Sequence, residues 1–151
     1  MIVDRSLADV VAAISIRDEK IKHFIELNES DIKSLERGFF TFDTINRIEI
    51  KQKELKEKFN VLGYWNVPIL NEEWKLGDIF NEGDFQRILK NEKILRDALF
   101  VYQTTPDIPP VSFYFEDINS IEKILQDLED MTEDIKEHYR ICGDYECGSD
   151  I

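Results

Sequence analysis

The side chains with the clearest metal-binding chemistry lie near the end of the chain, where His138, Cys142 and Cys147 fall within ten residues. An imidazole and two thiolates are ligands that Zn²⁺ accepts, but a structural zinc site is tetrahedral and needs four. The fourth ligand would have to come from another chain or from a carboxylate. We therefore favour free thiols or a disulfide in the tail over zinc, and we expect no metal and no cofactor.

Other residues that could form an active site are sparse. The second histidine, His23, lies beside Phe24, and neither histidine has a Ser or Cys partner in a recognisable motif. The six glycines are scattered and form no phosphate-binding loop. The 32 acidic residues guarantee neighbouring carboxylates by chance, so such pairs do not indicate a glycosidase or a magnesium site. We expect a protein without catalytic residues that is not an enzyme.

The composition is that of one acidic globular domain. A chain of 151 residues with 42% hydrophobic residues can bury a single core. The net charge of -13 repels a phosphate backbone, which disfavours direct nucleic-acid binding. Residues 116–151 hold twelve acidic side chains against three basic ones. No apolar run approaches the roughly 20 residues that cross a membrane, so we expect no membrane partner and synthesis in the cytosol.

Hydrophobic periodicity predicts a mainly α fold, a four-helix-type small domain with long ordered aromatic loops. The predicted helices cover residues 6–27, 31–37, 43–60, from Asp84 as N-cap to about 99, and 117–138. Gly38 is expected to end the second helix in the left-handed conformation, and Gly63 is expected to end the third. The carboxylates of the last helix are expected to face solvent. Residues 1–141 form one helical domain in this interpretation, and residues 142–151 form a short acidic C-terminal tail.

An internal echo links three of the predicted helices. The segments NRIEIKQKEL at 46–55, QRILKNEKIL at 86–95 and NSIEKILQDL at 119–128 each have isoleucine at the third position and leucine seven residues later. A polar residue, Asn46, Gln86 or Asn119, stands first in each. Any amphipathic helix can show the apolar spacing, and the alternative is a repeated packing unit.

The segment 64–80 is the candidate partner-binding region. A connection of about 17 residues without helical periodicity is uncommon in a compact domain and usually serves function or is disordered. Its aromatic residues argue against disorder, and the candidates for docking are Tyr64, Trp65, Trp74 and Phe80. The alternative is that the two tryptophans cover the core of the domain itself.

Several motifs in order resemble a family of tail-associated structural proteins from phages and prophages of Gram-positive bacteria. The segment DRSLADV at 4–10 is similar to the DRTxxDV start of that family. The segment GFF at 38–40, followed by TINRIE at 44–49, is similar to its glycine–aromatic segment that leads into LNRIE or LNRVE. Further matching residues are Trp74, Asp78, Ile79, DFQRI at 84–88, Asn91, Leu95, Arg96, Asn119, IEKIL at 121–125, and CG at 142–143 and 147–148.

The resemblance implies a phage virion structural protein, a tail, baseplate or fibre-associated adaptor that acts through contacts with other phage virion proteins. It implies localisation in the virion after synthesis in the host cytoplasm. Because virion proteins act in many copies, we also expect a homo-oligomer. The alternative hypothesis is a soluble acidic phage-encoded inhibitor, a DNA mimic whose negative C-terminal segment occupies a basic groove on a host defence enzyme.

Overall fold

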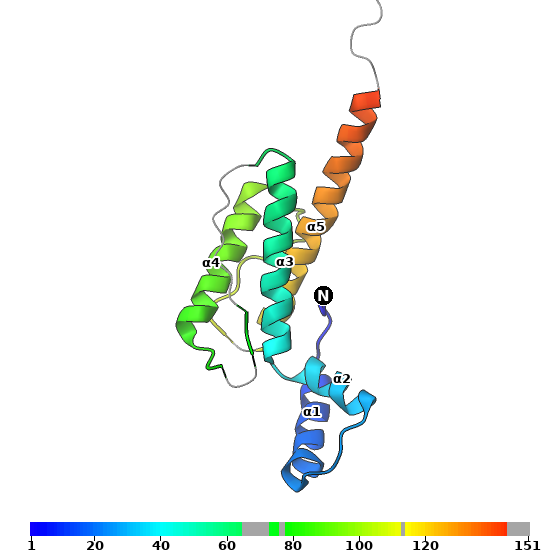
Figure 1. Ribbon diagram of the computed structural model, residues 1–151, viewed down its shortest axis with the longest axis vertical. Coiled ribbons are helices and arrows are strands. Elements are labelled where there is room, and N and C mark those ends of the chain that lie inside the picture. Colours follow the sequence, from blue (N-terminus) through cyan, green and yellow to red (C-terminus); the bar gives the residue numbers. More distant parts are fainter. Residues whose placement is uncertain (65–72, 76–77, 113, 145–151) are drawn as a thin grey trace, which may run out of the picture.

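The computed structural model describes residues 1–64, 73–75, 78–112 and 114–144, with side chains as far as residue 138. The helices are α1 (Leu7–Glu19), η1 (Ile21–His23, a short 3-10 helix), α2 (Glu29–Gly38), α3 (Phe42–Val61), α4 (Glu82–Ala98) and α5 (Phe115–Asp144). No strand occurs in these ranges, and the prediction of a mainly α fold is confirmed. Figure 1 shows two units, a bundle of α3, α4 and α5, and a hairpin of α1 and α2 that projects from one end of the bundle.

The core of the bundle is built from the three echoed segments. Their isoleucines and leucines are all at most 1% exposed: Ile48, Ile88, Ile121, Leu55, Leu95 and Leu128. Two aromatic rings, Phe59 and Phe85, are buried among them. The echo is therefore a repeated packing unit in the sense that each copy contributes the same two positions to one core.

The three helices of the bundle run in the same direction (Figure 1). Side-chain pairs at matching levels show this, because Arg47 near the start of α3 contacts Glu122 near the start of α5, and Lys58 near the end of α3 contacts Glu133 further along α5. A helix of 20 residues such as α3 is about 30 Å long. Each connection must return over a similar distance, which takes about nine residues even when fully extended. Parallel helices thus require the long connections at residues 62–81 and 99–114.

The hairpin is closed by a near contact between small residues. A Cβ added at Gly38 would lie 2.3 Å from the Cβ of Ala13 and 2.4 Å from the backbone oxygen of Asp9. Only glycine lets α1 and α2 approach this closely. The expectation that Gly38 ends α2 in a left-handed conformation was wrong, since Gly38 is the last residue of the helix and its φ is not positive. The end of α3 was expected at Gly63, and this residue follows the helix and its C-cap Leu62 with φ of 88°.

The predicted first helix, residues 6–27, ends early. Regular α-helix stops at Glu19, η1 follows, and Phe24 takes the left-handed conformation with φ of 55°. The Ile25 amide then donates to the Lys20 carbonyl, which closes the turn that reverses the chain into α2. Apolar spacing continues through this turn, which is why periodicity alone extended the helix too far.

The start of α4 and the end of α5 also differ from the prediction. Asn81 is the N-cap of α4, and its side chain accepts from the amides of Gly83 and Asp84. Asp84 is the third residue of the helix and accepts from the Asn81 amide in return, which completes a capping box. Helix α5 continues to Asp144, beyond the predicted domain boundary at residue 141. Residues 145–151 of the predicted tail lie outside the described part of the chain.

Candidate functional site

One of the four predicted docking residues, Trp74, lies in the core, and Phe80 is partly buried against it. Trp74 is 8% exposed, and its indole Nε1 donates to the Glu49 carboxylate at 2.6 Å. Phe80 packs edge-on against Trp74 and Phe85. The burial of Trp74 agrees with the alternative that the tryptophans cover the core of the domain, and both side chains anchor a returning connection to the bundle. Tyr64 remains exposed, with its ring near Phe59. Trp65 lies outside the described residues.

The exposed apolar surface is found instead on the hairpin. Leu7, Val11 and Ile14 recur at intervals of four and three residues, which places them on one face of α1. Ile21 and Phe24 follow in the turn at the tip, and Phe24 is 97% exposed. We call these five residues the apolar stripe. Ile14 and Ile21 are partly covered by the chain, whereas Leu7, Val11 and Phe24 are more than half exposed, and contiguous apolar surface on a soluble protein usually marks an interaction site.

A hollow of about 470 Å³ continues the apolar stripe at the base of the hairpin. Its lining comes from the start of α1, from the end of α2 and from the residues that lead into α5. Most of these side chains are apolar or aromatic: Leu7, Val10, Phe39, Phe40, Tyr114 and Phe115. We call this hollow the junction groove. Since Leu7 belongs to both features, the apolar stripe and the junction groove form one continuous surface.

Several charged groups of the hairpin pair with one another. The Arg37 guanidinium contacts Asp9 at 3.0 Å and Asp4 at 3.3 Å. Hydrogen bonds from Arg37 and from Ser6 hold the pKa of the Asp9 carboxyl well below its usual range. Lys20 contacts Asp31 in the same way, and its hydrogen bond lowers the pKa of that carboxyl. This end of the molecule therefore combines compensated charge with an exposed apolar face.

A buried ion cluster fixes the hairpin to the bundle. The guanidinium of Arg5, just before α1, donates to Glu122 of α5 at 2.7 Å, with the two side chains 3% and 0% exposed. Arg47 of α3 donates to the other oxygen of the same carboxylate at 2.8 Å. Asn119 holds the Arg5 backbone by one bond in each direction. Arg47 also contacts Glu36 of α2, so three helices meet at this cluster.

A similar arrangement holds the connection before α4. Asn46 bonds the Trp74 backbone in both directions, as Asn119 does for Arg5. Glu49, three residues later, accepts from Trp74 and from Arg87, as Glu122 accepts from Arg5 and Arg47. An Asn-x-x-Glu pair thus clamps an extended segment at two of the three echoed helices. The sequence aligned Asn46 with Asn119 and Glu49 with Glu122 in the internal echo, but charged residues on these helices were expected to face solvent.

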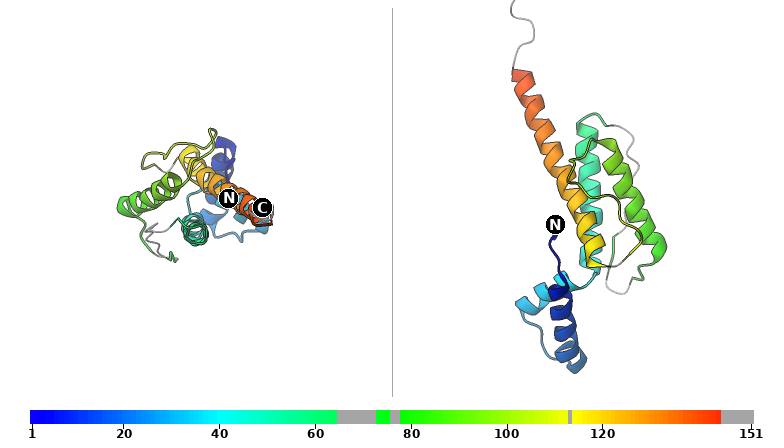
Figure 2. Two further views of the ribbon diagram at one scale, coloured as in Figure 1. Left: turned by 90° about the horizontal axis from the view of Figure 1, so that it is seen from above. Right: turned by 180° about the vertical axis from the view of Figure 1, so that it is seen from behind.

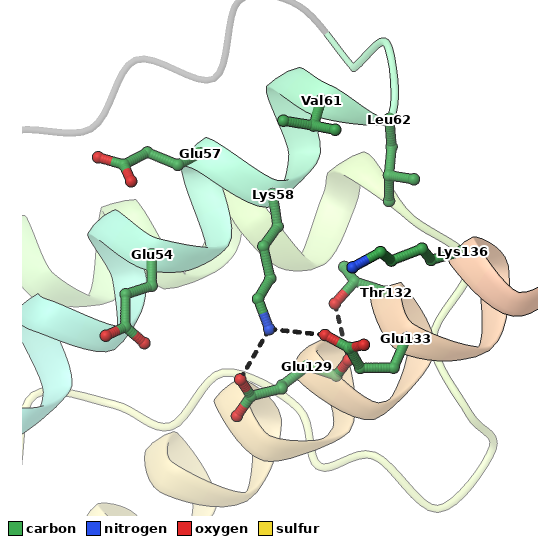
Figure 3. Close-up of a pocket in the computed structure, with 9 residues that line it drawn as sticks. All are labelled: Glu54, Glu57, Lys58, Val61, Leu62, Glu129, Thr132, Glu133 and Lys136. Atoms are coloured by element: carbon green, nitrogen blue, oxygen red, sulfur yellow. Dashed lines mark hydrogen bonds and ion pairs between the residues drawn. The ribbon is translucent and has the colours of Figure 1, made fainter.

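Most carboxylates of α5 face solvent as expected, among them Glu116, Asp130, Asp134 and Glu137, but two do not. Glu122 is fully buried, and Asp127 is buried between Lys123 and the Thr105 hydroxyl, which donates at 2.7 Å. Figure 3 shows a second hollow, of about 400 Å³, between α3 and α5. Lys58 crosses it to Glu129 and Glu133, both at 2.9 Å. These charges bind α3 to α5, and the neighbouring Lys58 lowers the pKa of both glutamates.

One buried carboxyl has no cation beside it. Glu92 of α4 is fully buried and accepts from Gln52 of α3 at 2.9 Å, while its Oε1 has no hydrogen-bond partner among the described residues. Burial raises the pKa of this carboxyl to about 8. Gln52 also donates to the Ile88 carbonyl, so the pair crosses the interface between α3 and α4. Glu92 is therefore protonated at neutral pH.

The described side chains include no group of three or more potential metal ligands. His23 and His138 are exposed, and His138 Nδ1 lies 2.7 Å from the Asp134 carbonyl. The side chains of Cys142 and Cys147 lie outside the described set. Within the described ranges, no helix combines the length and the apolarity that crossing a membrane requires.

Comparison with protein-family models, curated proteins and solved structures finds no match to this chain.

Proposed function

We propose that this chain is a structural protein of a tailed-phage virion, a tail, baseplate or fibre-associated adaptor that works through protein–protein contacts. The observation that carries the proposal is the apolar stripe, exposed on a hairpin that projects from the bundle (Figure 2). Side chains of this kind each contribute about 1.5–3 kcal/mol when a partner covers them completely. The motif resemblance to tail-associated proteins supplies the virion setting.

The attachment of the hairpin supports an adaptor role. A docking surface binds tightly when its geometry is fixed before the partner arrives, because less conformational entropy is then lost on binding. Arg5 and Glu122 fix the start of α1, and the contact at Gly38 fixes α2 against α1. The hairpin is thus presented as a rigid arm. Several of its charges are paired internally, and the apolar stripe is the surface that a partner would cover.

The acidic-inhibitor alternative draws less support from the structure. A DNA mimic needs carboxylates that are free to face a basic groove. Among the acidic residues of α5, Glu122 and Asp127 are buried, and Glu129 is held by Lys51 and Lys58. These three are not free to contact a partner, whereas Glu116, Asp130, Asp134 and Glu137 of the same helix are exposed.

Mass spectrometry of gradient-purified phage particles tests the proposal. The particles are washed in high salt to remove adsorbed cytosolic proteins, and peptides from this chain are quantified against those of the major tail protein. A structural component persists through the wash in a fixed ratio to the tail protein. Abundance in the lysate together with absence from washed particles would contradict the virion role and favour a soluble inhibitor.

A further inference from the structure

We propose that the junction groove binds an extended apolar segment of a partner protein. A large side chain of that segment enters the hollow, and one of its backbone carbonyl oxygens accepts a hydrogen bond from the Arg5 guanidinium. The inference rests on the proposed function, since it states which kind of segment the adaptor holds. It is carried by the apolar lining of the hollow and by a buried donor that has no acceptor.

The shape of the junction groove suits a large apolar side chain. Two of its lining residues, Thr44 and Ile118, are at most 2% exposed, whereas Leu7 and Tyr114 are 66% and 75% exposed, so the hollow reaches from the surface to the core. The rest of its apolar lining is half-buried: Val10, Phe39, Phe40 and Phe115. A volume of about 470 Å³ falls within the range of about 300–1,000 Å³ that is typical of ligand pockets. An apolar side chain that enters this hollow therefore exchanges water for apolar surroundings.

The charged side chains that line the junction groove are both arginines. Arg5 and Arg37 line it, and no carboxylate is found among its described lining residues. A guanidinium donates hydrogen bonds and cannot accept them, so these two groups favour a ligand with an acceptor. Arg37 has its partners already, because each of its three nitrogens donates to Asp4 or Asp9. The hydrogen-bonding capacity that remains is on Arg5.

Arg5 uses one of its two terminal nitrogens and leaves the other without a partner. The side chain is 3% exposed, and its Nη1 donates to Glu122 at 2.7 Å and to the Ile2 carbonyl at 2.6 Å. Nη2 of the same guanidinium is buried and has no hydrogen-bond partner among the described residues. A buried donor without an acceptor costs free energy, which is regained when a bound group supplies the acceptor.

A neutral carbonyl oxygen suits this position better than a carboxylate does. Arg5 already contacts Glu122, and Arg37 already contacts Asp9. A further full negative charge would lie near these carboxylates and be repelled by them. The Ile2 carbonyl shows the favourable case within the chain, since a neutral backbone oxygen accepts from the same guanidinium. The expected ligand group is therefore the backbone of a polypeptide.

The bundle holds non-helical segments of its own chain by the same combination of contacts. Asn119 bonds the backbone of Arg5 before α1, and Asn46 bonds the backbone of Trp74 before α4. Each held segment also packs an apolar side chain on the core, Met1 in the first case and Trp74 itself in the second. The junction groove offers an apolar lining beside a group that binds backbone oxygen, and it is hollow in the described part of the chain (Figure 1 shows where the hairpin meets the bundle).

NMR titration of the isotopically labelled full chain with phenylacetamide, toluene and phenylacetate tests the site. The three compounds share one ring and differ in carrying a neutral carbonyl, no acceptor or a carboxylate. Phenylacetamide should cause saturable shifts at Leu7, Tyr114 and the Arg5 guanidinium, with a smaller shift at Arg37. Toluene should bind about tenfold more weakly, as for loss of one hydrogen bond to a charged group, and phenylacetate should bind no more tightly than phenylacetamide. Equal binding of toluene, tighter binding of phenylacetate, or no saturable shift at the groove would overturn the inference.

Leu7→Ser and Val11→Ser are the matched variants for this titration. Both residues are exposed apolar residues of α1, and of the two only Leu7 lines the junction groove. Leu7→Ser should weaken phenylacetamide binding by about five- to tenfold because it removes apolar contact, and Val11→Ser should leave it unchanged. Equal effects of the two variants would contradict the site. Failure of these titrations on the isolated chain would leave the virion role standing, whereas absence of the chain from washed particles would contradict that role and leave the groove unaffected.

Discussion

The buried carboxyl of Glu92 gives a stability prediction that depends on pH. Its folded-state pKa is about 8, against an ordinary value of 4.5. Between these two values the folded chain retains a proton that the unfolded chain has lost. Stability therefore falls as pH rises through this window and levels off above pH 8. Over the whole window the loss is at most about 5 kcal/mol, and between pH 6 and 8.5 it is about 2 to 3 kcal/mol.

Urea denaturation of the wild type and of Glu92→Gln at pH 6 and pH 8.5, followed by circular dichroism, measures this loss. The amide of the variant cannot ionise but can still accept from Gln52, so its stability should be nearly equal at the two pH values. His23 and His138 are exposed in both proteins, so any contribution from them cancels in the comparison. Parallel pH dependence of the two proteins would refute the assignment of a protonated, buried Glu92.

Three further variants test the bundle and the hairpin by other measurements. Glu122→Gln should lower the free energy of unfolding in urea by about 3–5 kcal/mol, because it leaves the buried Arg5 without its carboxylate and removes one of the two carboxylate partners of Arg47. The exposed Glu133→Gln should lower it by less than about 1 kcal/mol; similar losses for the two variants would show that the buried ion cluster stabilises the fold no more than a surface ion pair does. Ile88→Asp should abolish the helical circular dichroism spectrum, since it buries an unpaired charge in the core, and a native spectrum would disprove the core position. Gly38→Val should speed amide hydrogen exchange in α1 by displacing it from Ala13; unchanged exchange would contradict the close approach.

The core of the bundle could be predicted from the sequence because it follows from local periodicity. Ile48 and Leu55 lie seven residues apart on one face of a helix, and burial of that face is the only way to remove both from water. The direction of the helices could not be predicted in this way. The long connection at residues 62–81 indicated function when considered alone, yet parallel helices require it and Trp74 anchors it.

The buried charges were missed because charged residues on amphipathic helices usually face solvent. Glu49 and Glu122 occupy the same position of the echo, each three residues after an asparagine. This coincidence was a usable signal, because a carboxylate that recurs beside a core isoleucine indicates that both carboxylates make the same kind of buried contact. Arg87 is the partner of Glu49 and Arg5 is the partner of Glu122, and both pairs are so far apart in sequence that they could not be assigned without the structure.

The sequence predicted an apolar face on the first helix, but it could not predict whether that face packs against the rest of the chain or stays exposed. Periodicity placed Leu7, Val10, Val11, Ile14, Ile21, Phe24 and Ile25 on one face of a single helix, and in the structure only the first four lie on α1. Whether such a face packs inside the chain or against a partner depends on tertiary arrangement, and here the hairpin projects from the bundle (Figure 1). The position of Phe24 at the tip depends on its own left-handed backbone conformation, and the sequence has no glycine near residue 24 that would have predicted a turn there.

The most direct test of the central claim is the content of particles assembled with stripe variants. Phage lacking the wild-type gene is complemented with Val11→Asp or with Phe100→Asp, and the chain is quantified by mass spectrometry in washed particles. Both substitutions are at exposed positions and add the same carboxylate, so they differ only in whether they touch the apolar stripe. Our account predicts that Phe100→Asp is incorporated at the wild-type level and that Val11→Asp is lost from particles while remaining folded in the lysate. Incorporation of both variants at the wild-type level would contradict it.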